Sequence, residues 1–343
     1  MRHLLNTLYV TTQGAYLARD GETVLVRVEQ QDRLRVPIHT LGGIVCFGQV
    51  SCSPPLMGLC GERGVAISFL TEHGRFLARV QGPVSGNVLL RREQYRRADL
   101  EDRSAEVARM AVTGKVANAR AVLLRAVRER PDASGAGKLG AAAERLAGIL
   151  NELRSNPALD RTRGLEGDAA HAYFSAFDHL IAVQKEGFYF RERSRRPPLD
   201  NLNALLSFVY TLLVHDAAAA LETVGLDPAV GFLHRDRPGR PSLALDLMEE
   251  FRPVLADRLV LTLINRQQVR PEGFRTTESG GVLMDDPMRK EVLLAYQKRK
   301  QEEITHPFLE EKMELGLLPY VQALLLARFL RGDLDAYPPF LWK

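Results

Sequence analysis

The chain has 343 residues, of which 45% are hydrophobic and 26% are charged, and its formal net charge is +4. This length and apolar content can fill two cores, and the composition excludes an intrinsically disordered chain. No apolar run reaches about 18 residues and the first residues lack a signal-peptide pattern, so we expect a cytoplasmic protein with no membrane span.

The basic residues and the cysteines indicate which ligands the protein can bind. Eight of the 46 basic residues are lysines and the rest are arginines, whose planar guanidinium can donate two parallel hydrogen bonds to a phosphate. A GC-rich coding sequence would give the same bias, so only the local clustering of arginines is informative. Cys46, Cys52 and Cys60 form no CxxC pair, which predicts reduced core thiols rather than a zinc site.

The first 86 residues are predicted to be rich in β-strands. Residues 23–28 alternate apolar and polar side chains directly after an Asp20-Gly21 hairpin signal. Other short apolar stretches predict strands at 43–47, 65–70 and 76–80, with one short helix at 54–60.

From residue 87 onward the apolar residues follow helical spacing. The predicted helices lie at 87–112, 116–129, 139–154, 168–185, 200–224, 243–251, 253–264, 287–303 and 315–331. The sequence therefore predicts an α+β protein. It would have a small N-terminal β-rich domain at 1–86, a connecting helix at 87–113, and a larger all-α domain at 114–343.

The first candidate site residue is Glu166, which lies between Gly164 and Gly167. Glycines permit backbone conformations closed to other residues, so we expect a turn that directs this carboxylate into a cleft, with Asp168 as the cap of the next helix. The alternative is a carboxylate that only favours a helix N-terminus through the helix dipole. Asp168 and His171 are three residues apart and could form a metal pair, but we assign His171 a supporting place.

A second group of candidates follows Ser242, which is expected to cap a helix. Asp246 and Glu249 are three residues apart on this helix and share a face. Two acidic side chains beside apolar neighbours are costly unless they are paired or bind a metal. Arg252 would provide such pairing as the alternative to a metal, and Glu250 is expected to point elsewhere and to be solvated.

His234 ends the apolar run 230–233 and opens an arginine-rich loop. Alternatively, His234 is a surface histidine or a hydrogen-bonded core histidine with no role in a metal site. Together with Glu166 and Glu249, however, it completes a set of two carboxylates and one imidazole. These are ligand types that hold Mg²⁺ or Mn²⁺, which points to metal-assisted phosphodiester chemistry on nucleic acid.

Arginine-rich segments accompany these residues. Segment 187–198 mixes Phe and Tyr with arginines, which suits a phosphate backbone and an unpaired base, although a solvated loop whose aromatics fill the core fits equally. Segment 337–342 is either a docking strip or packs on its own domain. We predict DNA-backbone contacts from Arg163, Arg191, Arg193, Arg195, Arg196, Arg235 and Arg252.

The order of these motifs resembles the CRISPR-associated spacer-integration nuclease, which is the catalytic integrase subunit of the adaptation complex. The resemblance covers essentially the whole chain and rests on segments 41–45, 64–70, 163–167, 196–207, 226–234 and 242–253. It implies that the β-rich domain forms a homodimer and that the helical domain is catalytic. It also implies that two dimers flank a dimer of a small ferredoxin-fold CRISPR-associated partner.

The resemblance implies a metal site made by Glu166, His234 and Glu249, with Mg²⁺ or Mn²⁺ bound and Asp246 as an accessory acid. The third ligand is commonly aspartate in this family, so Asp246 stays an alternative to Glu249 as the direct ligand. In the implied reaction, the 3′-hydroxyl of a short double-stranded DNA fragment attacks a phosphodiester at the edge of a CRISPR repeat and inserts a new spacer. A stand-alone nuclease on branched DNA and a non-catalytic DNA-binding scaffold are the alternatives.

Overall fold

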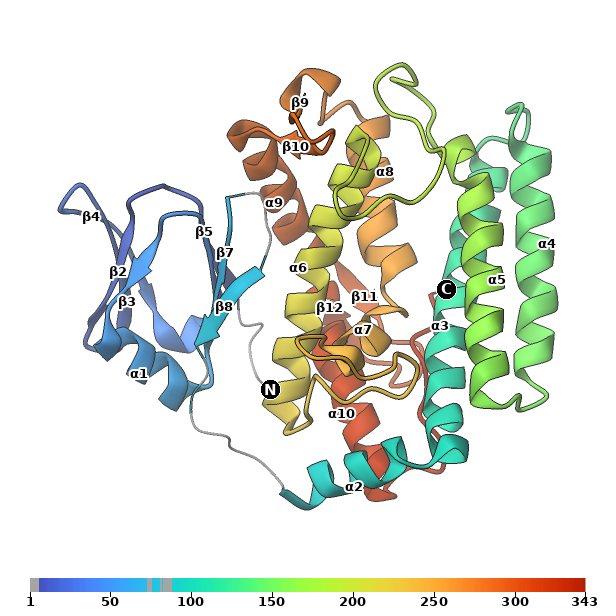
Figure 1. The fold of residues 1–343 in the computed structure, drawn as a ribbon, viewed down its shortest axis with the longest axis horizontal. Helices are drawn as coiled ribbons and strands as arrows, with labels where there is room; N and C mark the ends of the chain where they lie inside the picture. The colour runs from blue at the N-terminus through green and yellow to red at the C-terminus, as the bar shows by residue number, and fades with distance from the viewer. Residues whose placement is uncertain (1–5, 73–75, 81, 83–87, 343) are drawn as a thin grey trace. The chain divides into compact units, whose positions relative to one another are not determined.

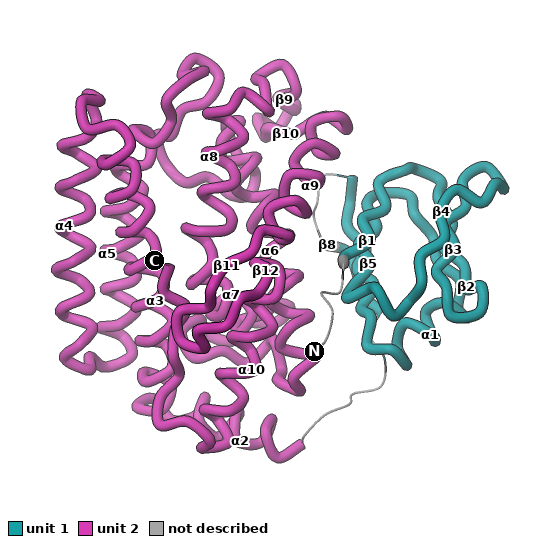
Figure 2. Tube along the Cα trace, turned by 180° about the vertical axis from the view of Figure 1, so that it is seen from behind, with its two compact units in different colours: residues 1–87 teal, residues 88–343 magenta. Residues whose placement is uncertain are grey.

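The computed structural model describes residues 6–72, 76–80, 82 and 88–342. The chain divides into two compact units, unit 1 at residues 1–87 and unit 2 at residues 88–343 (Figure 2). Unit 1 is rich in strands and unit 2 is mainly helical (Figure 1), which confirms the predicted α+β class. The segment 87–113, predicted as one connecting helix, belongs to unit 2 from residue 88 and is divided between two helices.

Unit 1 contains two four-stranded sheets. The first has the order β1-β5-β7-β8, in which β1 (Asn6–Val10), β5 (Leu41–Phe47) and β7 (Ala66–Leu70) are parallel and β8 (Phe76–Val80) is antiparallel to β7. The second has the order β4-β3-β2-β6. Its strands are β2 (Tyr16–Asp20), β3 (Thr23–Val28), β4 (Gln31–Pro37) and β6 (Ser51–Cys52). The predicted strands are present, and β1, β4 and β6 are additional.

The predicted short helix of unit 1 is α1 (Pro54–Arg63). The Ser53 hydroxyl accepts a hydrogen bond from the Leu56 N–H at its start, and Gly64 ends it with a φ of 69°, which favours glycine. Cys46 of β5 and Cys60 of α1 are buried in the apolar core, and burial raises the pKa of both thiols to about 12. The three cysteines are free, as the sequence predicted.

Unit 2 is built around helices that pack in two groups. The helices α3 (Glu101–Glu129), α4 (Ala136–Leu153) and α5 (Leu159–Phe177) pack on one another and lie side by side in Figure 1. The central helix α6 (Asn201–Val224) packs against α7 (Ser242–Met248), the π-helix η3 (Arg252–Asp257) and α10 (Leu318–Arg331). The remaining elements are α2 (Val88–Ala98), α8 (Arg258–Asn265), α9 (Asp286–Lys300) and two hairpins, β9 (Phe274–Thr276) with β10 (Val282–Met284) and β11 (Glu303–Thr305) with β12 (Lys312–Glu314).

The helix α6 is the element of the described chain that is long and apolar enough, by length and composition, to cross a membrane. However, 61% of its most apolar window is buried inside the fold. A helix that is apolar on most sides is also what the centre of a large core requires. Burial within unit 2 therefore accounts for its composition.

Three local predictions were wrong, and tertiary packing explains them. α3 runs unbroken through residues 113–115, where a break was predicted, and the break falls at 99–100 instead. α5 begins at Leu159, so Glu166 lies inside a helix rather than in a turn, and Asp168 is an exposed helical residue rather than a cap. Packing of α5 against α3 and α4 offsets the low helix propensity of its two glycines. Ser242 is the first residue of α7, and its hydroxyl donates to the Arg235 carbonyl rather than capping the helix.

Candidate metal centre

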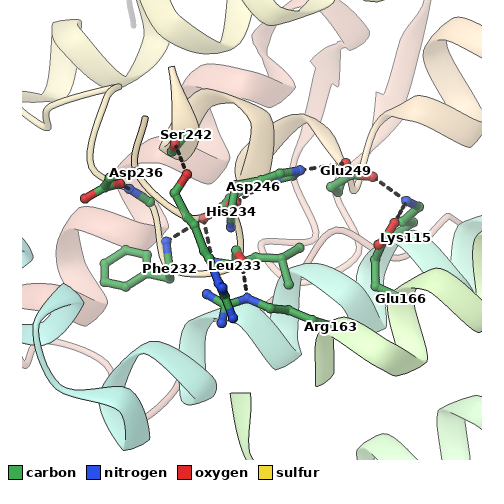
Figure 3. A network of polar contacts seen from close by, with 12 residues as sticks. Lys115, Arg163, Glu166, Phe232, Leu233, His234, Asp236, Ser242, Asp246 and Glu249 are labelled. Atoms are coloured by element: carbon green, nitrogen blue, oxygen red, sulfur yellow. Dashed lines mark hydrogen bonds and ion pairs between the residues drawn. The ribbon is translucent and has the colours of Figure 1, made fainter. Parts of the chain in front are cut away.

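Four side chains from separate elements meet in the interior of unit 2 (Figure 3). Glu166 comes from α5, His234 from the loop before α7, and Glu249 from the C-terminal end of α7. The His234 Nε2 atom lies 3.9 Å from Glu249 Oε1, which is too far for a hydrogen bond. Lys115 of α3 lies between the two carboxylates, in an ion pair with Glu166 and with its Nζ 2.7 Å from Glu249 Oε2. The structure thus places the three predicted residues in one region and adds Lys115, which the sequence did not indicate, between the two glutamates.

Asp246 organises the loop that carries His234. Its carboxylate accepts the backbone N–H groups of Phe232, Leu233 and His234 at 2.6, 2.9 and 3.0 Å. Its Oδ1 also lies 2.6 Å from His234 Nδ1. A proton on Nδ1 donated to Asp246 leaves the Nε2 lone pair facing Glu249. A Cβ at Gly231 would lie 2.9 Å from Asp246 Oδ2, so a glycine is needed for this close approach.

Glu249 is a buried carboxylate held by two cations. Arg252 Nη2 lies 3.2 Å from Oε1, and the Lys115 ammonium lies beside Oε2 without the orientation of a hydrogen bond. Burial raises the pKa of Glu249, but Arg252, Lys115 and His234 outweigh burial and lower it to about 2. Burial has the opposite effect on a lysine and lowers the pKa of Lys115. The Glu249 and Glu166 carboxylates outweigh burial and raise this pKa above its usual value. Glu249 and Lys115 therefore stay charged in the folded protein.

A second polar layer lies behind Arg252. The π-helix η3 begins at this residue and contains Pro253, whose missing N–H weakens the regular α-helical ladder, and π-helical turns are frequent at functional sites. The Arg252 guanidinium lies 4.9 Å from the Tyr210 ring centroid, and the Tyr210 hydroxyl donates to Asp257 Oδ1 at 2.6 Å. Burial raises the pKa of Asp257 to about 6. This layer fixes the orientation of the arginine that pairs with Glu249.

Glu250 was predicted to be solvated, and that prediction was wrong. Its side chain is fully buried and accepts hydrogen bonds from the Tyr337 hydroxyl, the Gln322 amide and the Phe340 N–H at 2.6, 3.0 and 2.7 Å. Burial raises the pKa of Glu250 to about 8. A Cβ at Gly114 would lie 2.9 Å from Glu250 Cγ, so this glycine permits the close packing of α3 on the turn. The C-terminal segment thus packs on its own domain, one of the two predicted alternatives.

Two of the predicted DNA-contacting arginines are engaged inside the protein. Arg193 donates to Asn203 Oδ1 at 2.6 Å and to Ser207 Oγ at 3.2 Å. Arg252 is held by Glu249 and Tyr210 as described. Because of these internal contacts, neither guanidinium is available to bind a phosphate in this arrangement. Their internal partners make them supports of the site.

The other predicted arginines lie nearer the surface. Arg163 donates to the Leu233 carbonyl at 2.8 Å and pairs with Asp160, and Arg235 lies 3.4 Å from the same Asp160 carboxylate. Arg191 stacks on the Tyr189 ring at 5.0 Å. Phe188 and Phe190 are buried, so these two aromatics fill the core. Of the seven arginines predicted to contact DNA, Arg191, Arg195, Arg196 and Arg235 are exposed.

The residues present fit a hard divalent ion. Two carboxylates and an imidazole nitrogen are suitable ligands, and Glu249 Oε2 is buried without a hydrogen-bond donor. As arranged in the described part of the chain, no three His, Cys, Asp or Glu side chains already form a chelating cluster. The Lys115 ammonium lies between two of the proposed ligands.

Fold and site define a two-unit α+β protein with an acid and histidine centre in its helical unit. The family model described as CRISPR associated protein Cas1 matches residues 8–298. The chain therefore belongs to the Cas1 family of CRISPR-associated proteins.

Two curated relatives match along their whole length. The CRISPR-associated endonuclease Cas1 1 of Chlorobaculum tepidum is 57% identical over 343 residues, covering 100% of both chains. The CRISPR-associated endonuclease Cas1 2 of Rhodospirillum rubrum is 54% identical over 347 residues, again covering 100% of both chains. Both relatives bear the name of an endonuclease.

Solved structures share the fold at low sequence identity. A Cas1 protein from Thermotoga maritima has a TM-score of 0.81 at 23% identity and covers 96% of this chain and 97% of that chain. A casposase bound to integration product has a TM-score of 0.83 at 21% identity, with coverage of 99% and 95%. A chain of a Cas6-RT-Cas1–Cas2 complex has a TM-score of 0.82 at 22% identity, and this chain covers 36% of it.

Proposed function

We propose that this chain is a metal-dependent DNA endonuclease and integrase of CRISPR adaptation. It would insert short DNA fragments as new spacers at the repeat, by attack of a 3′-hydroxyl on a phosphodiester. The observation that carries the proposal is that Glu249 lies 3.9 Å from His234 and shares the Lys115 ammonium with Glu166, so that residues from three elements contribute to one site. The endonuclease names of the full-length relatives and the integration product held by the casposase support the same reaction class.

In this proposal Glu166, His234 Nε2 and Glu249 hold Mg²⁺ or Mn²⁺. The bound ion would supply charge neutralisation at the phosphate and activation of the attacking hydroxyl. Glu249 is assigned as the direct ligand rather than Asp246, because Asp246 already accepts three backbone N–H groups and contacts His234 Nδ1. Arg252 fixes Glu249 through their ion pair.

The three side chains differ in their exposure to solvent, and this difference indicates the side from which substrate reaches the site. The Glu166 side chain is 29% exposed and His234 is 21% exposed, whereas Glu249 is 2% exposed. Substrate therefore approaches from the side of Glu166 and His234, where Arg235 begins the exposed basic loop. The exposed guanidiniums are suited to hold a DNA backbone by paired hydrogen bonds.

The proposed partners are double-stranded DNA, a second copy of this chain and a small ferredoxin-fold CRISPR-associated protein, with no membrane involved. One structural neighbour is a Cas6-RT-Cas1–Cas2 complex, which supports a CRISPR-associated partner protein. If phosphate contacts dominate, DNA affinity falls steeply with salt. A flat salt response would remove the arginine assignments.

A strand-transfer assay tests the proposal. Purified protein and its small partner are mixed with a labelled short duplex bearing free 3′-hydroxyls and a supercoiled plasmid carrying a repeat. Wild type, Glu166→Ala, His234→Ala and Glu249→Ala are compared in Mg²⁺, Mn²⁺ and EDTA. We expect label to join the plasmid only with metal, and to be lost in all three variants.

Other outcomes select other functions. Cutting without joining indicates a stand-alone nuclease on branched DNA. Joining that survives Glu249→Ala moves the direct ligand to Asp246. No metal-dependent activity in any form leaves a DNA-binding scaffold.

A further inference from the structure

Lys115 is a buried cation on a helix whose neighbouring face is apolar. It lies in α3 next to the buried residues Val112, Val116 and Ala119, and its own side chain is 11% exposed. Its ammonium lies between Glu166 and Glu249 (Figure 3). A charge placed at such a depth is costly unless it is paired, and here both partners are proposed metal ligands.

The ammonium contacts the oxygens that an ion would need. It pairs with Glu166 Oε1 and lies 2.7 Å from Glu249 Oε2, whereas Arg252 occupies the other oxygen, Oε1, of Glu249. A Mg²⁺-sized ion bound by both carboxylates would approach these oxygens to about 2.1 Å. Two cations that close to each other in a buried site repel strongly. The ammonium and the ion therefore compete for one position.

We propose that Lys115 is a tethered cation at the metal position: its ammonium joins Glu166 to Glu249 until a divalent ion displaces it, and so raises the metal concentration at which the site fills. This inference rests on the proposed function, since it takes these carboxylates as metal ligands. It explains how a carboxylate as buried as Glu249 remains compensated in the metal-free protein. Arg252 stays in place in both states and keeps Glu249 oriented.

The surroundings of Lys115 leave room for the movement. A small cavity is lined by Lys115 together with Tyr173, Tyr210, Arg252 and Asp257. Lysine has a flexible four-carbon stem, so its ammonium can change position while the Cα stays fixed.

Metal binding itself tests the proposal. Mn²⁺ affinity is measured by electron paramagnetic resonance for wild type, Lys115→Met and Lys115→Arg, with His234→Ala to define the site. We expect Lys115→Met to bind Mn²⁺ at least about tenfold more tightly, because a like charge is removed from a low-dielectric site. Lys115→Arg keeps the charge and should not gain affinity. The matched control is Lys138→Met, which removes an exposed charge from α4.

The same series separates two kinds of failure. If wild type shows no Mn²⁺ site that depends on His234, the proposed function fails at its metal centre. If wild type has that site and folded Lys115→Met binds Mn²⁺ no more tightly, only the role of Lys115 is overturned.

A measurement on wild type covers the case in which Lys115→Met does not fold. Lysines are modified with an amine-reactive reagent in EDTA and in saturating Mn²⁺, and the sites are read by mass spectrometry. Displacement predicts that modification of Lys115 rises severalfold with Mn²⁺ while Lys138 is unchanged. Equal modification of Lys115 in both conditions would contradict the proposal.

Discussion

The interiors of the two units follow opposite rules. Among the described residues of unit 1, the buried polar side chains are Ser53 and Ser68, and no charged side chain is buried. Unit 2 buries the charged residues Lys115, Asp246, Glu249, Glu250, Asp257 and Arg289. All of these except Arg289 lie on α3, on α7, on η3 or in the turn between α7 and η3.

The difference shows where the molecule keeps its chemistry. An apolar core such as that of unit 1 gains stability from every buried side chain. A buried charge gains nothing unless its partners are precisely placed, and removal of one partner leaves the other uncompensated. We therefore expect unit 1 to lose stability mainly when buried apolar volume is removed. We expect unit 2 to lose stability mainly when a buried charged side chain loses its partner.

The largest expected effect is the loss of Glu250. Glu250→Ala removes the buried acceptor of the Tyr337 hydroxyl and of the Phe340 N–H, and one of the acceptors of the Gln322 amide. We expect a stability loss of about 4 kcal/mol. Trp342 is the single tryptophan and contacts Phe340, so its fluorescence during urea unfolding reports on this region. The control is Glu144→Ala at a side chain that is 77% exposed. Equal midpoints for the two variants would refute the contrast.

Lost volume in unit 1 should have the next largest effect. Leu56 is fully buried at the start of α1, and Leu56→Ala should cost about 3 kcal/mol through lost burial and a residual cavity. Hydrogen exchange read by mass spectrometry should show faster exchange in unit 1. Leu34→Ala, at an exposed position in β4, is the matched control and should change little.

Asp246→Asn should break the site without removing a ligand. The amide can no longer accept every N–H that the carboxylate holds, so the His234 loop loosens and the imidazole loses its charged partner. We expect about a 10- to 100-fold fall in Mn²⁺ affinity and in strand-transfer rate. Asp236→Asn, in the same loop at an exposed position, should leave both nearly unchanged. An unaffected Mn²⁺ affinity in Asp246→Asn would show that Asp246 does not position His234.

The smallest effect is a pH dependence that originates at Asp257. Burial raises its pKa from 3.8 to about 6, so between these values the folded protein holds a proton that the unfolded chain has released. Its stabilising contribution is thus full below about pH 4 and is lost as the pH rises through 6, by about 1 kcal/mol per pH unit.

Urea unfolding of wild type and Asp257→Asn across this pH range measures that contribution. The stability of wild type relative to Asp257→Asn should fall as the pH rises from 4 to 6 and level off above 7. Asp132→Asn at an exposed position should show no such trend relative to wild type. A constant difference between wild type and Asp257→Asn would mean that burial does not raise this pKa.

Secondary structure was predictable where the local signal was strong. The hairpin at Asp20-Gly21, the helix α1 with its Ser53 cap and the start of α6 at Asp200 follow from turn and cap residues adjacent in sequence. The start of α5 was not predictable in this way, because Gly164 and Gly167 argue locally against the helix that packing enforces.

The candidate site was partly visible in the sequence. Glu166, His234 and Glu249 could be selected by residue type and motif order, since those are properties of the chain. Lys115 left one weak signal, a charged residue flanked at positions 111, 112, 116 and 119 by apolar residues. The burial of Glu250 left no signal in the sequence, because its hydrogen-bond partners lie 72 to 90 residues away.

By itself the sequence determined the α+β class, the change from strands to helices near residue 87, and the residues able to bind a metal or phosphate. Only the tertiary structure decided that Asp246 holds the His234 loop, that Arg193 and Arg252 face inward, and that Lys115 lies between two carboxylates. The physical reason is the sequence separation over which each interaction acts. Propensities and caps act over a few residues, whereas the partner of a buried charge is set by which helices pack together.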